Sequence, residues 1–426
     1  MTDTTILRED VRRRLDEIGE ADVLIGIPSY NNSRTIGHVV QAVTAGLAKY
    51  FPDQRSVLVN SDGGSKDGTP DVVSRSELGT TRSILLSHRV RRVHKVITAY
   101  QGLPGKGSAF RTVFEIAQRL GARACAVVDS DLRSITPEWI ELLLGPVLHE
   151  QFDYVCPLYS RHKYDGTITN SIVYPLVRSL YGKRIRQPIG GDFGFSGRLA
   201  AHYLTHNVWD SDVARYGIDI WMTTTALMGD FRICQSYLGA KLHDAKDPGA
   251  DLSAMLVQVT GSLFRQMETH AVRWREIASS EAVPEFGFKY EVGLEPIPVN
   301  VARMVHTFTQ GVQDFKPLYS AFLTPQTRAE LEALGAGEPE KFHMPQDLWV
   351  RVVYEFAAAY HHPRLNPDHL LKSLTPLYLG RTTSWINQAA DYGALDVENA
   401  LNALSERFEA LKPYLLERWQ EGRMHS

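Results

Sequence analysis

Asp129 and Asp131 are the two residues whose types and spacing most directly indicate chemistry in this sequence. They follow the short apolar run 124–128, which has the composition of a buried strand in a parallel sheet. Side chains two residues apart in an extended chain project to the same side, so both carboxylates are able to reach one cation. Carboxylate oxygens suit Mg²⁺ or Mn²⁺. A solvated turn after a strand is the alternative, and the tripeptide alone does not decide between the two.

The bulk composition indicates a globular protein of about two domains. The chain has 426 residues, of which 43% are hydrophobic and 22% charged. Its net charge of −3 gives no electrostatic reason to expect nucleic acid or an anionic membrane as a partner. The three cysteines are dispersed, which excludes a disulfide framework. We see neither a signal peptide nor an apolar run long enough to span a membrane, so we expect a cytoplasmic location.

Four strand–turn–helix units in series must position the two aspartates. Their strands are expected at 22–28, 56–60, 93–99 and 124–128. Each strand is followed by a polar or glycine-rich turn and then by a helix, which implies a mostly parallel sheet with helices on both faces. The chemically unusual turns all lie at the carboxyl ends of strands, where such a fold binds ligands.

We expect three parts in the chain: a leading helix within 1–21, an α/β catalytic domain at 22–250 and an α-helical domain at 251–426. In the leading helix, Val11, Leu15 and Ile18 share one face. Beyond residue 250 the glycine-rich strand ends disappear, and Pro, Gly and Glu at 281–298 indicate a loop. The C-terminal helices are expected at 251–275, 299–315, 325–334, 345–360, 369–392 and 397–419.

Four other interpretations of the motifs fail on their spacing. The turn 62–68 is not a calcium loop, because Gly64 and Lys66 stand at ligand positions. The segment 102–107 is too short for a phosphate-binding P-loop. An aspartate-based phosphatase is disfavoured because Arg133 stands at its partner position, and the first strand is not followed by the glycine pattern of a dinucleotide site.

A nucleotide-sugar interpretation remains, and here the sequence resembles the family 2-like glycosyltransferases of GT-A fold. Within that family it is similar to the mannosylglycerate, glucosylglycerate and glucosyl-3-phosphoglycerate synthases. One short motif is weak, but the ordered set indicates a GT-A, Rossmann-like domain with a helical C-terminal domain. The motifs are Pro28-Ser-Tyr30-Asn31, Asp62-Gly-Gly-Ser-Lys-Asp67, Pro104-Gly-Lys106-Gly, Asp129-Ser130-Asp131, Arg161 with Asp165-Gly-Thr-Ile-Thr169, Gln187-Pro-Ile-Gly190-Gly191-Asp192, Tyr216-Gly-Ile-Asp219, Lys241-Leu-His243, Met344-Pro-Gln-Asp-Leu-Trp349 and Arg381-Thr-Thr-Ser-Trp385.

The resemblance implies a site for the donor and a divalent cation. It assigns the cation, Mg²⁺ or Mn²⁺, to Asp129, Asp131 and His243. For Asp62 a helix N-cap is an equally good explanation, and Lys106 has the alternative of a solvated surface lysine. Glycines beside Lys106 are expected to let the backbone approach a phosphate, and the Gly190-Gly191 turn to offer N–H groups to an anion. The donor-binding residues are Pro28, Tyr30, Asn31, Asp62, Lys106, Asp129, Ser130, Gly190 and Gly191.

The resemblance also implies an acceptor site and a catalytic set. Arg161 is expected to bind the acceptor carboxylate, with a structural salt bridge as its alternative. Asp192 and Asp219 are expected to hold sugar hydroxyls in a retaining, front-face reaction, and a helix N-cap is the alternative for Asp219. The acceptor residues are Arg161, Thr169, Gly190 and Asp219. The catalytic residues are Asp131, Asp192, Asp219 and Arg161.

The expected function is a metal-dependent, retaining hexosyltransferase that uses an NDP-sugar, GDP-glucose first and a UDP-linked donor second. The expected acceptor is D-glycerate, which would give glucosylglycerate, a compatible solute. Mannosyl transfer to glycerate comes next, and then transfer to 3-phosphoglycerate, for which Lys183, Arg184 and Arg186 supply positive charge. A polysaccharide transferase and a non-enzymatic nucleotide-sugar sensor are the alternatives. The leading helix and the helical half make a homodimer the expected assembly.

Overall fold

The chain packs as two units. The computed structural model describes residues 5–76, 91, 93–242, 252–289, 297–334, 338–362 and 365–421. The first unit comprises Met1–Ser160, Arg186–Asp244 and Val283–Gly293, and the second comprises Arg161–Ile185, Ala245–Ala282 and Leu294–Ser426. This division differs from the predicted one: 161–185 packs with the second unit, 283–293 packs with the first, and the second unit resumes at Ala245 and not at residue 251.

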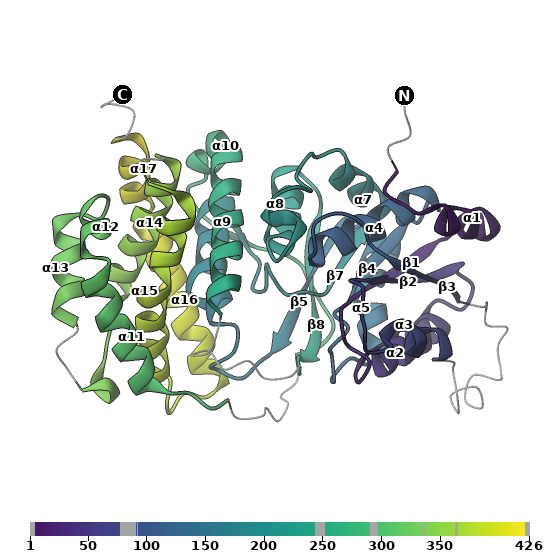
Figure 1. Ribbon diagram of the computed structural model, residues 1–426, viewed down its shortest axis with the longest axis horizontal. Helices are drawn as coiled ribbons and strands as arrows, with labels where there is room; N and C mark the ends of the chain where they lie inside the picture. The colour runs from purple at the N-terminus through teal and green to yellow at the C-terminus, as the bar shows by residue number, and fades with distance from the viewer. Residues whose placement is uncertain are drawn as a thin grey trace. The chain divides into compact units, whose positions relative to one another are not determined.

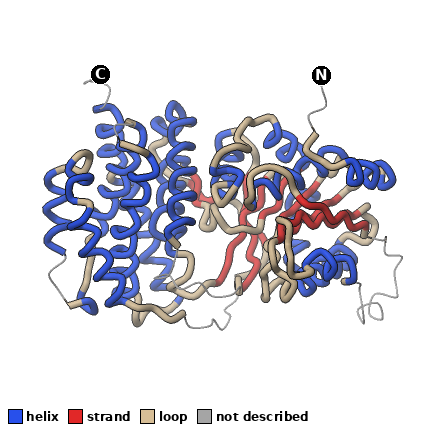
Figure 2. Tube along the Cα trace, in the orientation of Figure 1, coloured by secondary structure: helices blue, strands red, loops and turns tan. Residues whose placement is uncertain are grey.

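A mixed sheet forms the centre of the first unit (Figures 1 and 2). In the described part of the chain it has eight strands, in the order β10-β8-β5-β7-β4-β1-β2-β3. All neighbours are parallel except β7, which is antiparallel to both β4 and β5. The predicted mostly parallel sheet is therefore confirmed. The strands are β1 Val23–Ser29, β2 Ser56–Asp62, β3 His94–Ala99, β4 Ala124–Val127, β5 Tyr154–Ser160, β7 Phe193–Ser196, β8 Ile233–Ala240 and β10 Glu285–Phe286.

Helices cover both faces of this sheet. α2, α3 and α5 lie on one face and α4, α7 and α8 on the other, while α1 packs near β3 (Figure 1). The apolar strands β1 and β4 are fully buried between these layers, which explains their continuous hydrophobic runs. Val11 and Leu15 of α1 are buried, as predicted. These helices are α1 Glu9–Ile18, α2 Ile36–Tyr50, α3 Thr69–Arg75, α4 Lys106–Arg119, α5 Pro137–Glu150, α7 Gly197–Leu204 and α8 Ile218–Met228, with a 3₁₀ turn at Asp212–Ala214.

The second unit is helical, apart from the two-residue strands β6 Lys183–Arg184 and β9 Glu281–Ala282, which pair with each other. Its first turn, η2 Thr169–Val173, is π-helical and leads directly into α6. No helix among the described residues is long and apolar enough to cross a bilayer. The helices are α6 Tyr174–Tyr181, α9 Ser253–Thr269, α10 Ala271–Glu276, α11 Val301–Asp314, α12 Lys316–Ser320, α13 Pro325–Ala333, α14 Gln346–His361, α15 Pro367–Gln388, α16 Ala394–Ala410 and α17 Lys412–Glu421, with a 3₁₀ turn at Pro339–Lys341.

Three details of the predicted C-terminal elements are wrong. The expected helix 397–419 is two helices, α16 and α17, because Pro413 lacks the N–H that would continue α16. The expected helix 251–275 also divides, into α9 and α10, at His270. The expected loop 281–298 contains the short strands β9 and β10, and β10 adds to the edge of the large sheet beside β8.

Gly26 in β1 should not tolerate a larger residue, because α4 lies directly on it. A Cβ at Gly26 would lie 2.6 Å from Cγ2 of Val113. We expect Gly26→Ala to lower the free energy of unfolding by about 1–3 kcal/mol in urea titrations, and Val113→Ala to recover part of that loss in the double variant. Gly145→Ala is the control: it lies in α5 with open space around it, so it should stabilise by about 0.5–1 kcal/mol. If the losses of unfolding free energy from Gly26→Ala and Val113→Ala simply add in the double variant, this packing is contradicted.

Candidate active site

Asp62, the last residue of β2, organises the turn that follows its strand. Its carboxylate is buried and accepts four hydrogen bonds. The donors are the Ser29 and Ser65 hydroxyls and the backbone N–H groups of Gly64 and Ser65, at 2.6–2.8 Å. The N-cap alternative is wrong, since Gly68 stands at the N-cap of α3. With four donors the carboxylate is at its usual capacity, so its role toward a nucleotide stays a prediction.

Polar side chains also join the turns after β1, β2 and β4. Asn31, which has a positive φ of 55°, accepts a hydrogen bond from the Lys66 N–H. The Asn32 side chain accepts from the Ser130 hydroxyl at 2.9 Å. Asp67 accepts from Ser33 and Thr69, and these hydrogen bonds hold its pKa well below the usual range. The predicted donor residues of the first two turns and Ser130 therefore form one connected edge of the sheet.

Two tyrosines flank Gly63 at this edge. A Cβ at Gly63 would lie 3.1 Å from both the Tyr100 hydroxyl and a ring carbon of Tyr30. The Tyr30 side chain is 62% exposed, which is unusual for a large aromatic residue. The Tyr100 hydroxyl accepts a hydrogen bond from the Gly105 N–H and so joins this edge to the start of α4. An exposed ring beside a glycine offers a flat surface on which a base is able to stack.

A network of two lysines and three aspartates lies beside these turns. Both oxygens of Asp129 are bound: Lys106 Nζ lies 2.8 Å from Oδ1, and Lys241 Nζ lies 2.8 Å from Oδ2. Lys241 also binds Asp192 at 2.7 Å, and Lys106 lies 3.5 Å from Asp219. The Lys241 side chain is only 4% exposed and that of Lys106 16%. The surface-lysine alternative for Lys106 is therefore wrong.

The strands bring these five groups together. Asp129 lies two residues after β4, Lys241 directly follows β8, and Lys106 begins the helix that follows β3. Asp192 directly precedes β7, and because β7 is antiparallel its starting end lies at the carboxyl edge of the parallel strands. Asp192 is fully buried, and it accepts hydrogen bonds from the Asp129 N–H and the Tyr159 hydroxyl.

Burial and mutual attraction shift the pKa values of this network in opposite directions. Burial raises the pKa of Asp129, but the two lysines more than reverse this and hold it well below the usual range. Burial lowers the pKa of Lys106, but Asp129 and Asp219 more than reverse that and raise it above the usual value. Burial raises the pKa of Asp219, and the neighbouring carboxylates add to the rise. Asp219 therefore takes up a proton at a higher pH than an ordinary aspartate does.

Asp219 is not a helix N-cap, because Gly217 stands at the N-cap of α8 and Asp219 lies in its first turn. Its Oδ1 is buried and lies 3.5 Å from Lys106 Nζ, but among the described residues no group donates a hydrogen bond to it. A buried acceptor of this kind is costly until a donor fills it. Asp219 therefore has room to accept a hydrogen bond from a ligand hydroxyl.

The glycines near the network serve packing. A Cβ at Gly191, whose φ is +90°, would lie 2.4 Å from Oδ2 of Asp129. The carbonyl groups of Gly190 and Gly191 accept hydrogen bonds from Lys241 and Lys106 respectively, so this turn binds the lysines through its carbonyls. The glycines beside Lys106 also have a packing role, because a Cβ at Gly107 would lie 1.8 Å from the Val213 carbonyl oxygen, while their approach to a phosphate stays a prediction. These glycines let another backbone segment approach α4.

The predicted cation ligands are only partly described. Asp129 and Asp131 both lie after β4 and are partly exposed, whereas His243 lies outside the described residues. Among the described residues, three or more His, Cys, Asp or Glu side chains do not gather in one metal-binding group. The carboxylates suit a hard divalent cation, but both Asp129 oxygens already hold lysines. Each carboxylate oxygen keeps a second lone pair, so a cation at Asp129 would share these oxygens with the lysines unless one lysine withdrew.

The predicted acceptor residues Arg161 and Thr169 belong to the second unit. Arg161 Nη1 lies 3.5 Å from Asp165, so the salt bridge considered for this residue is present. Both side chains are largely buried, at 14% and 23% exposure. Thr169 is buried and begins the π-helical turn η2. Their binding of an acceptor stays a prediction.

Sequence reasoning missed Lys241, a member of the network, and Tyr159, which donates a hydrogen bond to Asp192. Lys241 was noted only as part of the motif that ends in His243. A signal was available: a lysine directly after the apolar run 233–240 stands at the same sheet edge as Asp129. Tyr159 has no such signal, because its partner Asp192 lies 33 residues away in the sequence.

Comparison with known proteins identifies the domain. Residues 24–200 match the family described as "Glycosyl transferase family 2". Together with the sheet described above, this match confirms the GT-A fold predicted for the first unit. The comparison with curated proteins gave no match.

Solved structures similar to this chain include three of glucosyl-3-phosphoglycerate synthase from Mycobacterium tuberculosis. The complex with Mn²⁺, UDP and phosphoglyceric acid is 22% identical, covers 59% of this chain and 82% of its own, and has a TM-score of 0.43. The complex with Mg²⁺ and UDP is 22% identical, covers 59% and 83%, and scores 0.44. The complex with Mn²⁺, UDP and glucosyl-3-phosphoglycerate is 21% identical, covers 67% and 92%, and scores 0.43. At these scores the similarity says nothing about what this chain binds.

Removal of Lys241 should destabilise the first unit, because Asp129 and Asp192 would lose a shared buried counter-charge. We expect Lys241→Met to lower the free energy of unfolding by roughly 3–5 kcal/mol in urea titrations at neutral pH. Lys49→Met is the matched control, since the Lys49–Glu138 pair is about half exposed and should contribute less than about 1 kcal/mol. Equal losses in the two variants would contradict a buried network.

The raised pKa of Asp219 predicts a specific pH dependence of stability. A group whose pKa is higher in the folded state favours folding below its unfolded pKa, and this contribution is lost as the pH rises through the folded pKa. As the pH rises from about 4, the ordinary pKa of an aspartate, through the raised folded-state pKa, wild type should therefore lose stability relative to Asp219→Asn, which does not titrate. Urea titrations at several pH values measure the difference. Asp210→Asn, at an exposed position, should track wild type; a constant Asp219→Asn difference would contradict the prediction.

Proposed function

Because residues 24–200 match the glycosyl transferase family 2 domain, we propose that the chain transfers a hexose from an NDP-sugar at the lysine–aspartate network. The observation that carries the proposal is Lys106, an ammonium group in a polar site at the carboxyl edge of the sheet. Three members of the network, Lys106, Asp129 and Asp192, fall within the matched segment. Tyr30 and the turn held by Asp62 lie at the same edge and supply the nucleotide end of the site.

Lys106 is the lysine that is able to change partners. Its side chain is 16% exposed and reaches the network from the first residue of α4, whereas Lys241 is 4% exposed and bound to three oxygens. A diphosphate offers more negative charge than one carboxylate, so the Lys106 ammonium would leave Asp129 for the donor. Lys241 would stay with Asp192 and hold the remaining carboxylates in place.

Asp131, His243 and the Asp129 carboxylate released by Lys106 are the residues that would hold Mg²⁺ or Mn²⁺. A divalent cation in such a site neutralises charge that develops on a departing nucleoside diphosphate. The proposal rests on the chemistry of the carboxylates at the end of β4. Asp192 and Asp219 would orient the hexose through its hydroxyls, and the buried Oδ1 of Asp219 supplies an open acceptor.

We propose D-glycerate as the acceptor, with glucose as the hexose and retention of its anomeric configuration. Arg161 would bind the acceptor carboxylate through its fork, and its present partner Asp165 keeps the guanidinium ordered until then. Mannosyl transfer to glycerate and transfer to 3-phosphoglycerate are the alternatives within this reaction. GDP-linked and UDP-linked donors both fit the proposal, and the homodimer and cytoplasmic location stay predictions.

A grid of donors and acceptors tests the function directly. GDP-glucose, UDP-glucose and GDP-mannose are each combined with D-glycerate and 3-phosphoglycerate, and release of nucleoside diphosphate is measured with Mg²⁺ or Mn²⁺. We expect turnover with glucose and glycerate that EDTA abolishes and added cation restores. If the protein binds nucleotide tightly but shows no turnover in any combination, the enzyme hypothesis is wrong and the nucleotide-sugar sensor is the better interpretation.

Arg161→Ala should impair use of the acceptor more than use of the donor. Loss of a hydrogen-bonded pair between charged groups, about 1.5–3 kcal/mol, should raise the acceptor KM roughly 10–100-fold. The donor KM should change less than about threefold. Steady-state kinetics with each substrate varied in turn measure both values. Arg303→Ala, at an exposed position of α11, is the control and should leave both KM values unchanged; equal effects of Arg161→Ala on both would remove Arg161 from the acceptor site.

A further inference from the structure

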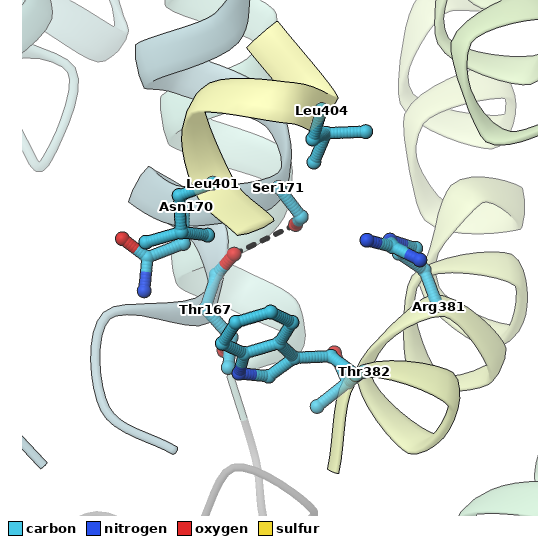
Figure 3. Close-up of a pocket in the computed structure, with 8 residues that line it drawn as sticks. Thr167, Asn170, Ser171, Arg381, Thr382, Leu401 and Leu404 are labelled. Atoms are coloured by element: carbon cyan, nitrogen blue, oxygen red, sulfur yellow. Dashed lines mark hydrogen bonds between the residues drawn. The ribbon is translucent and has the colours of Figure 1, made fainter. Parts of the chain in front are cut away.

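A small, partly enclosed cavity in the second unit has an arginine in its wall. The cavity lies between α15, α16 and the turn η2, and its volume is about 10 Å³. Figure 3 shows Arg381 extending from α15 toward the side of the cavity formed by Thr167 and Ser171. The residues that line the cavity are Thr167, Asn170, Ser171, Arg381, Thr382, Trp385, Leu401 and Leu404.

Arg381 is buried without a counter-charge among the described residues. The residue is 2% exposed, and its Nε and Nη1 have no hydrogen-bond partner there. Burial alone lowers the pKa of Arg381 to about 10. At neutral pH the guanidinium still carries its charge, and an unpaired buried charge is strongly unfavourable.

The other buried charges of this unit show how it ordinarily compensates them. The Arg178 guanidinium pairs with Glu409 at 3.0 Å. The Lys412 ammonium binds three backbone carbonyl groups, and the Glu355 carboxylate accepts hydrogen bonds from Thr324, Thr327 and Tyr414. Arg381 departs from this pattern, and the cavity beside it is where its missing partner fits.

The cavity restricts that partner by size and chemistry. A volume of about 10 Å³ is close to the least that holds one water molecule. Phosphate, carboxylates and nucleotides are too large, and among anions only a monatomic ion comes near this size, with its entry widening the pocket slightly. Water fits but does not neutralise the guanidinium. The wall combines this cation and polar side chains with the apolar Leu401 and Leu404, and a low dielectric strengthens the attraction of the cation for an anion.

We infer that the cavity binds one monatomic anion, with chloride as the physiological ion, against the guanidinium of Arg381. The ion neutralises the buried charge and joins α15 to η2, the turn that contains Thr169. Anion binding in this cavity does not depend on the proposed transfer reaction. If the protein binds no anion here, the proposed function is unaffected.

Thermal unfolding tests the inference on the whole protein. At constant ionic strength, replacing sodium gluconate by about 0.1 M sodium chloride should raise the Tm by roughly 3 °C or more, because an ion that binds only the folded state stabilises it. Arg381→Met should lose this chloride dependence. Arg351→Met is the matched control, since Arg351 is also largely buried but paired with Glu330, and it should keep the dependence.

Crystals of the wild-type protein grown in sodium bromide give a second test that needs no variant. We expect an anomalous difference peak beside Arg381. A cavity that holds only water, or a wild-type Tm that is the same in chloride and gluconate, would overturn the inference.

Discussion

At the carboxyl edge of the large sheet, the ammonium groups of Lys106 and Lys241 compensate the charge of three aspartates. The positions of the surrounding loops depend on this charge compensation. Lys241 is bound at once by Asp129, Asp192 and a carbonyl of the Gly190-Gly191 turn. Buried ions tolerate little displacement, because a misplaced partner leaves a charge desolvated and unpaired. The chain after β4, before β7 and after β8 is therefore held by one shared interaction.

The same network limits what the site is able to bind. If all its members are ionised, three carboxylates face two ammonium groups, so the network has an excess of negative charge. A diphosphate would add more, and its binding requires that cations accompany it or that Asp219, whose pKa is raised, take up a proton. This electrostatic constraint links the proposed need for a divalent cation to the residues that would hold the sugar.

The two units treat buried charge differently. In the first, cations and anions meet where a parallel sheet gathers the ends of its strands. In the second, the charges lie between helices and are mostly satisfied by one neighbouring side chain or by backbone carbonyl groups, as at Arg178 and Lys412. Among the described residues, Arg381 is an exception to this pattern, and its sequence motif, Arg381-Thr-Thr-Ser-Trp385, gave no indication that the arginine is buried.

Local sequence patterns determined the first four strands, the helices that follow them and several C-terminal helices, because periodicity and turn residues act over short distances. They also indicated the edge of the sheet at which Asp62, Lys106 and Asp129 gather, but they did not predict β5, β7, β8 or β10. They did not determine the partners of those groups. The sequence indicated a metal as the partner of Asp129. In the structure its two oxygens bind Lys106 and Lys241, which lie far from it along the chain. Only the tertiary structure decides such pairings, because they depend on strand order and on the antiparallel β7, and nearby residues record neither.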